Sequence, residues 1–157
     1  MVRTIGVVCI LVIALVVGGC GKSSDGEGSK GESVSVDPFS KKVTIKGADG
    51  KGKGEFGEGV KLPAGFPKDV PLHKSGQVVA AFHQGDSFHV SVKTKDSAQK
   101  VIDAYSEKMK AEGWSQEQAM DLGAAKMVHF TKEGRKVTVT ATTTDDGAMV
   151  SITTQKD

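Results

Sequence analysis

Alternation of apolar and polar residues in the last third of the chain is the feature that most restricts its fold. A period of two residues is the period of a β-strand with one buried and one solvated face. Glu133-Gly134 and Asp146-Gly147 separate the alternating runs, and both pairs are typical of tight hairpin turns. The sequence therefore predicts an antiparallel meander formed by residues 125–131, 136–144 and 149–155, with a weaker strand at 114–120 before them.

The two turns also predict how these strands pair. A two-residue turn at Asp146-Gly147 sets Ala141 opposite Ile152, and the earlier turn sets Phe130 opposite Val137. A slip of one residue would turn every side chain to the other face, so both turns must agree on the buried residues. They agree on one buried face, which carries Val128, Phe130, Val137, Val139, Ala141, Val150 and Ile152.

One helix is predicted before the meander. Asp96-Ser97 supplies capping residues, and Gln99 follows Asp96 by three positions, as in a capping box. Gly113 and Trp114 are typical of a Schellman ending, in which the tryptophan packs back on the helix. The spacing of three and four residues predicts one apolar stripe, formed by Ala98, Val101, Ile102, Tyr105 and Met109. We therefore expect Trp114 and this stripe to belong to the core.

Two further strands, at 77–83 and 88–94, precede the helix, and three prolines make residues 62–72 an extended lead-in. A solvated sheet face implies that the other face is covered, and the single helix is the natural cover. We expect an α+β fold, with an antiparallel sheet of about five to six strands and one helix packed across one face. The order would be ββαββββ within a compact domain at 62–157.

Residues 20–61 are predicted to be a tether and a glycine-rich arm that precede this domain. Residues 21–33 contain no apolar side chain, which is typical of a flexible tether. The alternating runs 34–36 and 43–45 indicate a short hairpin or arm. Residues 47–59 are rich in glycine and charge, and we expect a loose loop there.

The amino terminus has the composition of an export signal. Arg3 is followed by an apolar run from residue 5 to 17, which is shorter than the roughly 20 residues that span a bilayer. Val17-Gly18-Gly19-Cys20 then resembles the lipobox of bacterial lipoproteins. The resemblance implies that the chain is cut between Gly19 and Cys20, which removes residues 1–19. It also implies that the Cys20 thiol receives a diacylglycerol, and that the new amine is, as usual in this family, acylated, with palmitate as the expected acyl group.

This resemblance also implies a location in the cell envelope. Gly21, and not Asp, follows the cysteine, which by likeness to enterobacterial sorting favours the periplasmic face of the outer membrane. In a cell with a single membrane the anchor would hold the domain on the outer surface. Cys9 would leave with the signal and Cys20 would carry lipid, so we expect no thiol catalysis and no disulfide.

A second resemblance covers about residues 34–157. FPKDVPL at 66–72, Tyr105 and Gly113-Trp114 match a pattern found in small envelope lipoproteins of bacteria. The likeness supports the expected fold. It brings no activity with it.

Composition narrows the function. A formal charge of +2 and an aromatic content of 5% argue against a nucleic-acid partner. No nucleophile elbow, zincin helix or calcium loop is found. We expect a lipid-anchored binding or scaffolding module that is not an enzyme, uses no cofactor, and contacts an envelope protein or a cell-wall component.

The alternative is a metal-handling or accessory periplasmic protein, and it depends on two histidines. If Phe82 pairs with Val90, then His83 stands opposite His89, close enough for one metal ion. Asp86 or His73 would add a further ligand. Two histidines are a weak zinc site, and the simpler interpretation is two exposed residues on the solvated face.

Overall fold

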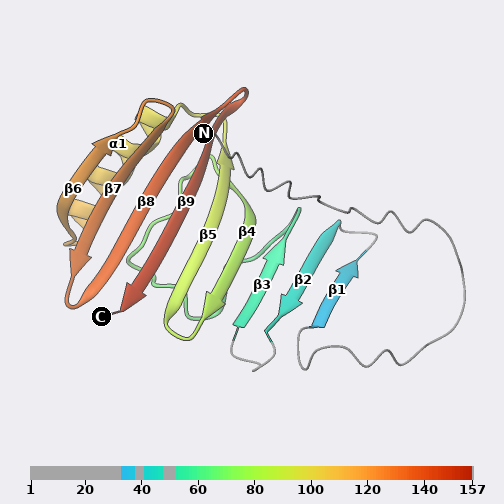
Figure 1. Ribbon diagram of the computed structural model, residues 1–157. Coiled ribbons are helices and arrows are strands. Elements are labelled where there is room, and N and C mark those ends of the chain that lie inside the picture. The colour runs from blue at the N-terminus through green and yellow to red at the C-terminus, as the bar shows by residue number, and fades with distance from the viewer. Residues whose placement is uncertain (1–32, 38–40, 48–51, 157) are drawn as a thin grey trace, which may run out of the picture.

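The computed structural model describes residues 33–37, 41–47 and 52–156, which form one antiparallel sheet and one helix (Figure 1). The expected signal at 1–19, Cys20 and the tether that follows it lie outside these residues. The strands are β1 (Ser33–Asp37), β2 (Lys42–Lys46), β3 (Gly52–Phe56), β4 (Gln77–Gln84), β5 (Ser87–Thr94), β6 (Ser115–Asp121), β7 (Ala125–Lys132), β8 (Arg135–Thr144) and β9 (Gly147–Lys156). The helix is α1 (Ala98–Ala111), and the strand order across the sheet is β1-β2-β3-β4-β5-β9-β8-β7-β6.

The antiparallel sheet with one helix across it is confirmed, but the expected number of strands is wrong. Nine strands form in the described part of the chain, because β1–β3 extend the sheet beyond β4. The glycine-rich loop is also corrected, since it contains β3. A Cβ on Gly54 would lie 3.1 Å from Phe82 Cδ2 and 3.2 Å from Phe56 Cε2, so glycine leaves room for two aromatic rings.

Helix α1 packs across β6–β9 on one face of the sheet (Figure 1). We call this the covered face and the opposite side the open face. Residues 57–76 continue the cover: Val60 and Val70 join the core, and the Phe66 ring meets the Phe88 ring edge-on with centroids 5.9 Å apart. The core therefore lies between β4, β5 and β7–β9 on one side and these two segments on the other.

The helix ends where the sequence predicts, with one difference. Ser97 is the N-cap and accepts a hydrogen bond from the Lys100 amide, whereas Gln99 bonds to Asp103, so the capping box is wrong. Gly113 has a φ of 82°, and the Trp114 amide donates to the Met109 carbonyl at 2.9 Å, which confirms the Schellman ending. The predicted apolar stripe is buried throughout.

The buried face predicted for the last three strands, β7–β9, is confirmed. Their predicted residue pairing is confirmed only in part. Phe130 lies opposite Val137 as expected. Ala141, however, lies opposite Val150, because the turn is at Asp145-Asp146 and not one residue later. The register therefore shifts by two residues, which preserves the faces, and the residues predicted to be buried are all buried.

Among the described residues, no helix is long and apolar enough to cross a membrane.

Candidate functional site

We call strands β1–β3 the arm. A pocket of about 310 Å³ lies where the arm meets the segment that follows β3. We call it the Glu55 pocket. Its volume is at the lower end of the range of about 300–1,000 Å³ that is typical of small-molecule sites. Its walls are formed by Lys42, Lys53, Glu55, Lys61, Leu62, Pro63, Ala64, Ala81 and His83.

Strand alternation brings these side chains together. Lys53 pairs with His83, and Glu55 pairs with Ala81, so all four side chains point to the covered face. Ala81 is buried among the core residues, whereas the next strands outward carry charge on the same face. The pocket therefore forms where the covered face changes from apolar to polar.

The pocket carries more positive than negative charge. Lys42 Nζ and Lys53 Nζ each lie 2.7 Å from a different carboxylate oxygen of Glu55. Hydrogen bonds from Lys42, the larger cause, and from Lys53 lower the pKa of Glu55 below its usual value, although burial raises it. Lys61 also lines the pocket and makes no ion pair with a described residue, so the lining holds three lysines and one carboxylate.

Apolar side chains complete the pocket. Leu62, Pro63, Ala64 and Ala81 supply the apolar part of its lining. Cationic groups beside an apolar wall suit an anion that carries a short apolar part, since the charge meets lysine while the remainder leaves water. The geometry therefore fits binding of an anionic ligand.

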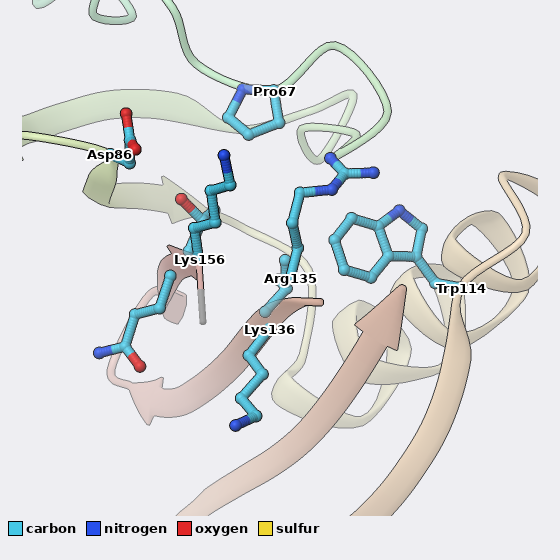
Figure 2. Close-up of a pocket in the computed structure, with 9 residues that line it drawn as sticks. Pro67, Asp86, Trp114, Arg135, Lys136 and Lys156 are labelled. Carbon is cyan, nitrogen blue, oxygen red and sulfur yellow. The ribbon is translucent and has the colours of Figure 1, made fainter. Parts of the chain in front are cut away.

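A second hollow, of about 160 Å³, lies beside Trp114 and Arg135 (Figure 2). The Arg135 guanidinium lies 4.8 Å from the indole centroid, and both its terminal nitrogens donate to Asp69. The hollow is smaller than typical ligand pockets, and its arginine already has a carboxylate partner. We interpret it as part of the packing that holds residues 62–72.

A serine, a histidine and an aspartate also meet at the start of α1. His73 Nε2 lies 2.8 Å from Asp96 Oδ2, and Ser75 Oγ donates to the same oxygen at 2.6 Å. Hydrogen bonds from Lys100, Ser75 and His73 hold the pKa of Asp96 well below its usual range. The serine hydroxyl faces the carboxylate and not the imidazole, so the arrangement lacks the nucleophile–base contact of a hydrolase. It ties residues 73–75 to the helix.

The predicted histidine pair is wrong. His83 lies opposite Phe88 on the covered face, whereas His89 lies opposite Phe82 on the open face. A β-bulge between Val78 and Ala80 and a two-residue turn at Gly85-Asp86 set this register. The two imidazoles therefore cannot share a metal ion.

The other proposed ligands do not restore a metal site. His73 is bonded to Asp96, and Asp86 lies in the β4–β5 turn. Within the described parts of the chain, no group of three histidine, cysteine or acidic side chains is placed to hold a metal. His89 instead lies within hydrogen-bond distance of Thr153 Oγ1, at 3.1 Å, on the open face.

Sequence reasoning missed the lysines of the Glu55 pocket. The available signal was the alternation Lys53-Gly54-Glu55, which sets two charges on one strand face. It was obscured because the surrounding glycines suggested a loop. The partners Lys42 and Lys61 also lie on separate segments, so only the strand pairing brings them near.

Comparison with known protein families gives a match to the part of the chain that contains α1. No curated protein and no solved structure shows significant similarity to this chain. Residues 77–155, which run from β4 through α1 to β9, match the START domain-like family. The arm strands β1–β3 and residues 57–76 precede the matched region. The match covers half of the sequence, and the chain therefore belongs to the START domain-like family.

Proposed function

We propose that this chain is a non-catalytic binding module, held in the cell envelope by lipid on Cys20, which takes an anionic envelope component into the Glu55 pocket. The observation that carries the binding proposal is a pocket lined by three lysines, one carboxylate and several apolar side chains. Membership in the START domain-like family supports a ligand-binding role. The ligand chemistry comes from the pocket of this chain and not from the family.

The position of the pocket supports this role. It is bordered by Ala81 and His83 of the family domain and by Lys42, Lys53 and Lys61 of the preceding residues. A ligand there would contact both parts of the chain. Binding would therefore stabilise the attachment of the arm to the domain, because a ligand that binds only the folded state adds to its stability.

Calorimetric titration of the full chain with hexanoate tests the proposal. Hexanoate offers one carboxylate and a short apolar chain, and hexylammonium offers the same chain with the opposite charge. We expect heat from hexanoate alone, and an affinity that falls as salt is raised, because the attraction is partly screened. Equal binding of the two probes would contradict an anion site.

Matched lysine variants locate the binding. Lys61→Gln removes a charge from the pocket without leaving Glu55 unpaired, and should weaken hexanoate several-fold. Lys74→Gln makes the same change of charge at an exposed position outside the pocket and should leave binding unchanged. Equal effects of both substitutions would show that net charge, and not the pocket, attracts the probe.

The anchor is tested separately. The lipobox 17–20 and the polar residues after it support lipid attachment at Cys20. Cys20→Ser should leave the precursor uncleaved and without lipid, which intact-mass measurement reads directly. A wild-type chain that is cleaved and carries no lipid would contradict the anchor while leaving the pocket proposal intact.

A further inference from the structure

The open face of the arm is apolar. Val34, Ile45, Gly54 and Phe82 form one row across β1–β4, and each lies opposite the next. Val36, Val43, Phe56 and Ala80 form the neighbouring row. Val34 and Val36 are 63% and 62% exposed, and Phe56 and Phe82 are 41% and 40% exposed. An apolar patch that reaches the edge of a sheet is typical of an interaction surface.

The two edges of the sheet differ in how they resist pairing. Strand β6 is mostly polar, carries Glu117 and Asp121, and is interrupted by a bulge between Gln116 and Gln118. Strand β1 is SVSVD, with regular pairing to β2 and neither lysine nor proline within it. Charges and bulges are the usual protection of an exposed edge, and β1 has little of either.

We propose that β1 pairs antiparallel with β1 of a second copy of this chain, so that the two sheets and their apolar rows become continuous. A two-fold axis through Ser35 pairs the full length of the strand. Val34 then lies opposite Val36 of the second copy, and Ser33 lies opposite its Asp37. The contact is self-complementary, as a two-fold interface requires.

Charges on the covered face agree with this register. Ser33 lies opposite Lys46 and Asp37 lies opposite Lys42 within one chain. Across the axis, Asp37 approaches Ser33 of the second copy, with Lys46 of that copy on the next strand. Each Asp37 therefore lies between Lys42 of its own chain and a neutral serine of the second copy, and no like charges stand directly opposite each other across the β1–β1 contact.

A lipid surface would leave the backbone hydrogen-bonding groups at the β1 edge without partners. Lipid would cover Val34 and Val36, but the outward N–H and C=O groups of β1 would lose water without gaining partners. Open sheet edges are excluded from hydrocarbon for this reason. A second β1 strand covers the valines and bonds the backbone together, which favours a copy of this chain over a membrane.

Cysteine cross-linking in intact cells that express the full chain tests the interface. Ser35→Cys, on a Cys9→Ser background, places a thiol on the axis, where Cα atoms of directly opposed residues lie about 4.5–5.5 Å apart. Ala119→Cys, at an exposed position of β6, is the control for the opposite edge. The background chain alone reports any dimer formed through Cys20.

We expect a mild oxidant to convert most of the Ser35→Cys chain to a disulfide dimer and to leave Ala119→Cys monomeric. Adding Val34→Lys and Val36→Lys to Ser35→Cys should reduce the dimer at least tenfold, because lysine disrupts the apolar rows and the strand pairing. Equal cross-linking at both edges, or no dimer at Ser35, would overturn the proposal. So would a Ser35 dimer that persists in the double-lysine variant.

Discussion

Asp69 holds Arg135 through two parallel hydrogen bonds, with Nη1 donating to Oδ1 at 2.9 Å and Nη2 donating to Oδ2 at 2.7 Å. The backbone carbonyl of Asp69 also accepts the indole N–H of Trp114 at 2.9 Å. One residue therefore joins the proline-rich segment to β8 and to the end of the helix. The FPKDVPL and GW motifs lie far apart in sequence and meet at this contact.

We expect Asp69→Asn to lower the free energy of unfolding by about 1–2 kcal/mol, because it removes a bidentate, charge-assisted contact. The side chains of Asp69 and Arg135 are 23% and 28% exposed, so water screens part of the attraction. Urea unfolding measures the loss. Glu107→Gln, an equal change of charge on the exposed face of the helix, should shift the free energy by less than about 0.5 kcal/mol. Equal losses in both variants would contradict a specific contact.

Acid should weaken the same contact. Hydrogen bonds from Arg135 are the largest cause that lowers the pKa of Asp69 to about 2, against about 4 in an unfolded chain. A lowered carboxyl pKa stabilises the fold fully above about pH 4, and this stabilisation is lost as the pH falls toward 2. The difference between wild type and Asp69→Asn should therefore shrink between about pH 5 and pH 2.5 in urea unfolding. A difference that is constant across this range would exclude the titration of Asp69 as its cause.

The meander and helix could be predicted because each has two local signals that agree. Phe130 and Val137 are related by a tight turn, and the apolar alternation independently sets the same face. The turn after β8 was misplaced, yet its faces were right because a shift of two residues preserves parity. Local sequence signals therefore predict which face of the sheet a side chain occupies more reliably than they predict which residue it pairs with.

The β4–β5 hairpin shows where local signals fail. Its sequence allows Phe82 to be assigned to the buried face, but the bulge after Val78 reverses the parity of the strand. Phe82 then lies beside Gly54 of β3, a contact that only the arm provides. Because the glycine-rich residues 47–59 were expected to form a loose loop, the influence of β3 on this register, and on the Glu55 pocket, was not visible in the sequence.

The glycine after the β8–β9 turn is constrained by its surroundings. Gly147 has a φ of 138°, and an added Cβ would lie 2.2 Å from the Thr94 carbonyl oxygen and 2.6 Å from Lys95 Cα. We expect Gly147→Ala to cost about 3 kcal/mol or more, because backbone strain and overlap act together. Gly134→Ala is the matched control, since its φ is 68° and no atom lies within 4 Å of the added Cβ. It should cost about 1 kcal/mol. Comparable urea midpoints for the two variants would contradict the close approach to Thr94.

Trp114 combines packing with one specific hydrogen bond, and two substitutions separate them. The side chain is buried, its indole N–H donates to Asp69, and Arg135 lies over its ring. Trp114→Ala removes all three contacts and should cost about 3–5 kcal/mol. Trp114→Phe keeps a ring in the site but loses the donor, and should cost about 1–2 kcal/mol.

Circular dichroism must follow these unfolding curves, because Trp114 is the only tryptophan and its fluorescence is lost in both variants. If packing dominates, Trp114→Phe will unfold close to wild type, and adding Asp69→Asn will lower its stability by the same amount as in wild type. If the indole and the carboxylate act together, the two substitutions will be non-additive, because Arg135 is held by the Asp69 carboxylate and lies over the indole ring. The contacts through Asp69 predict non-additivity of at least about 0.5 kcal/mol, and strictly additive losses would show that the indole and the carboxylate act independently.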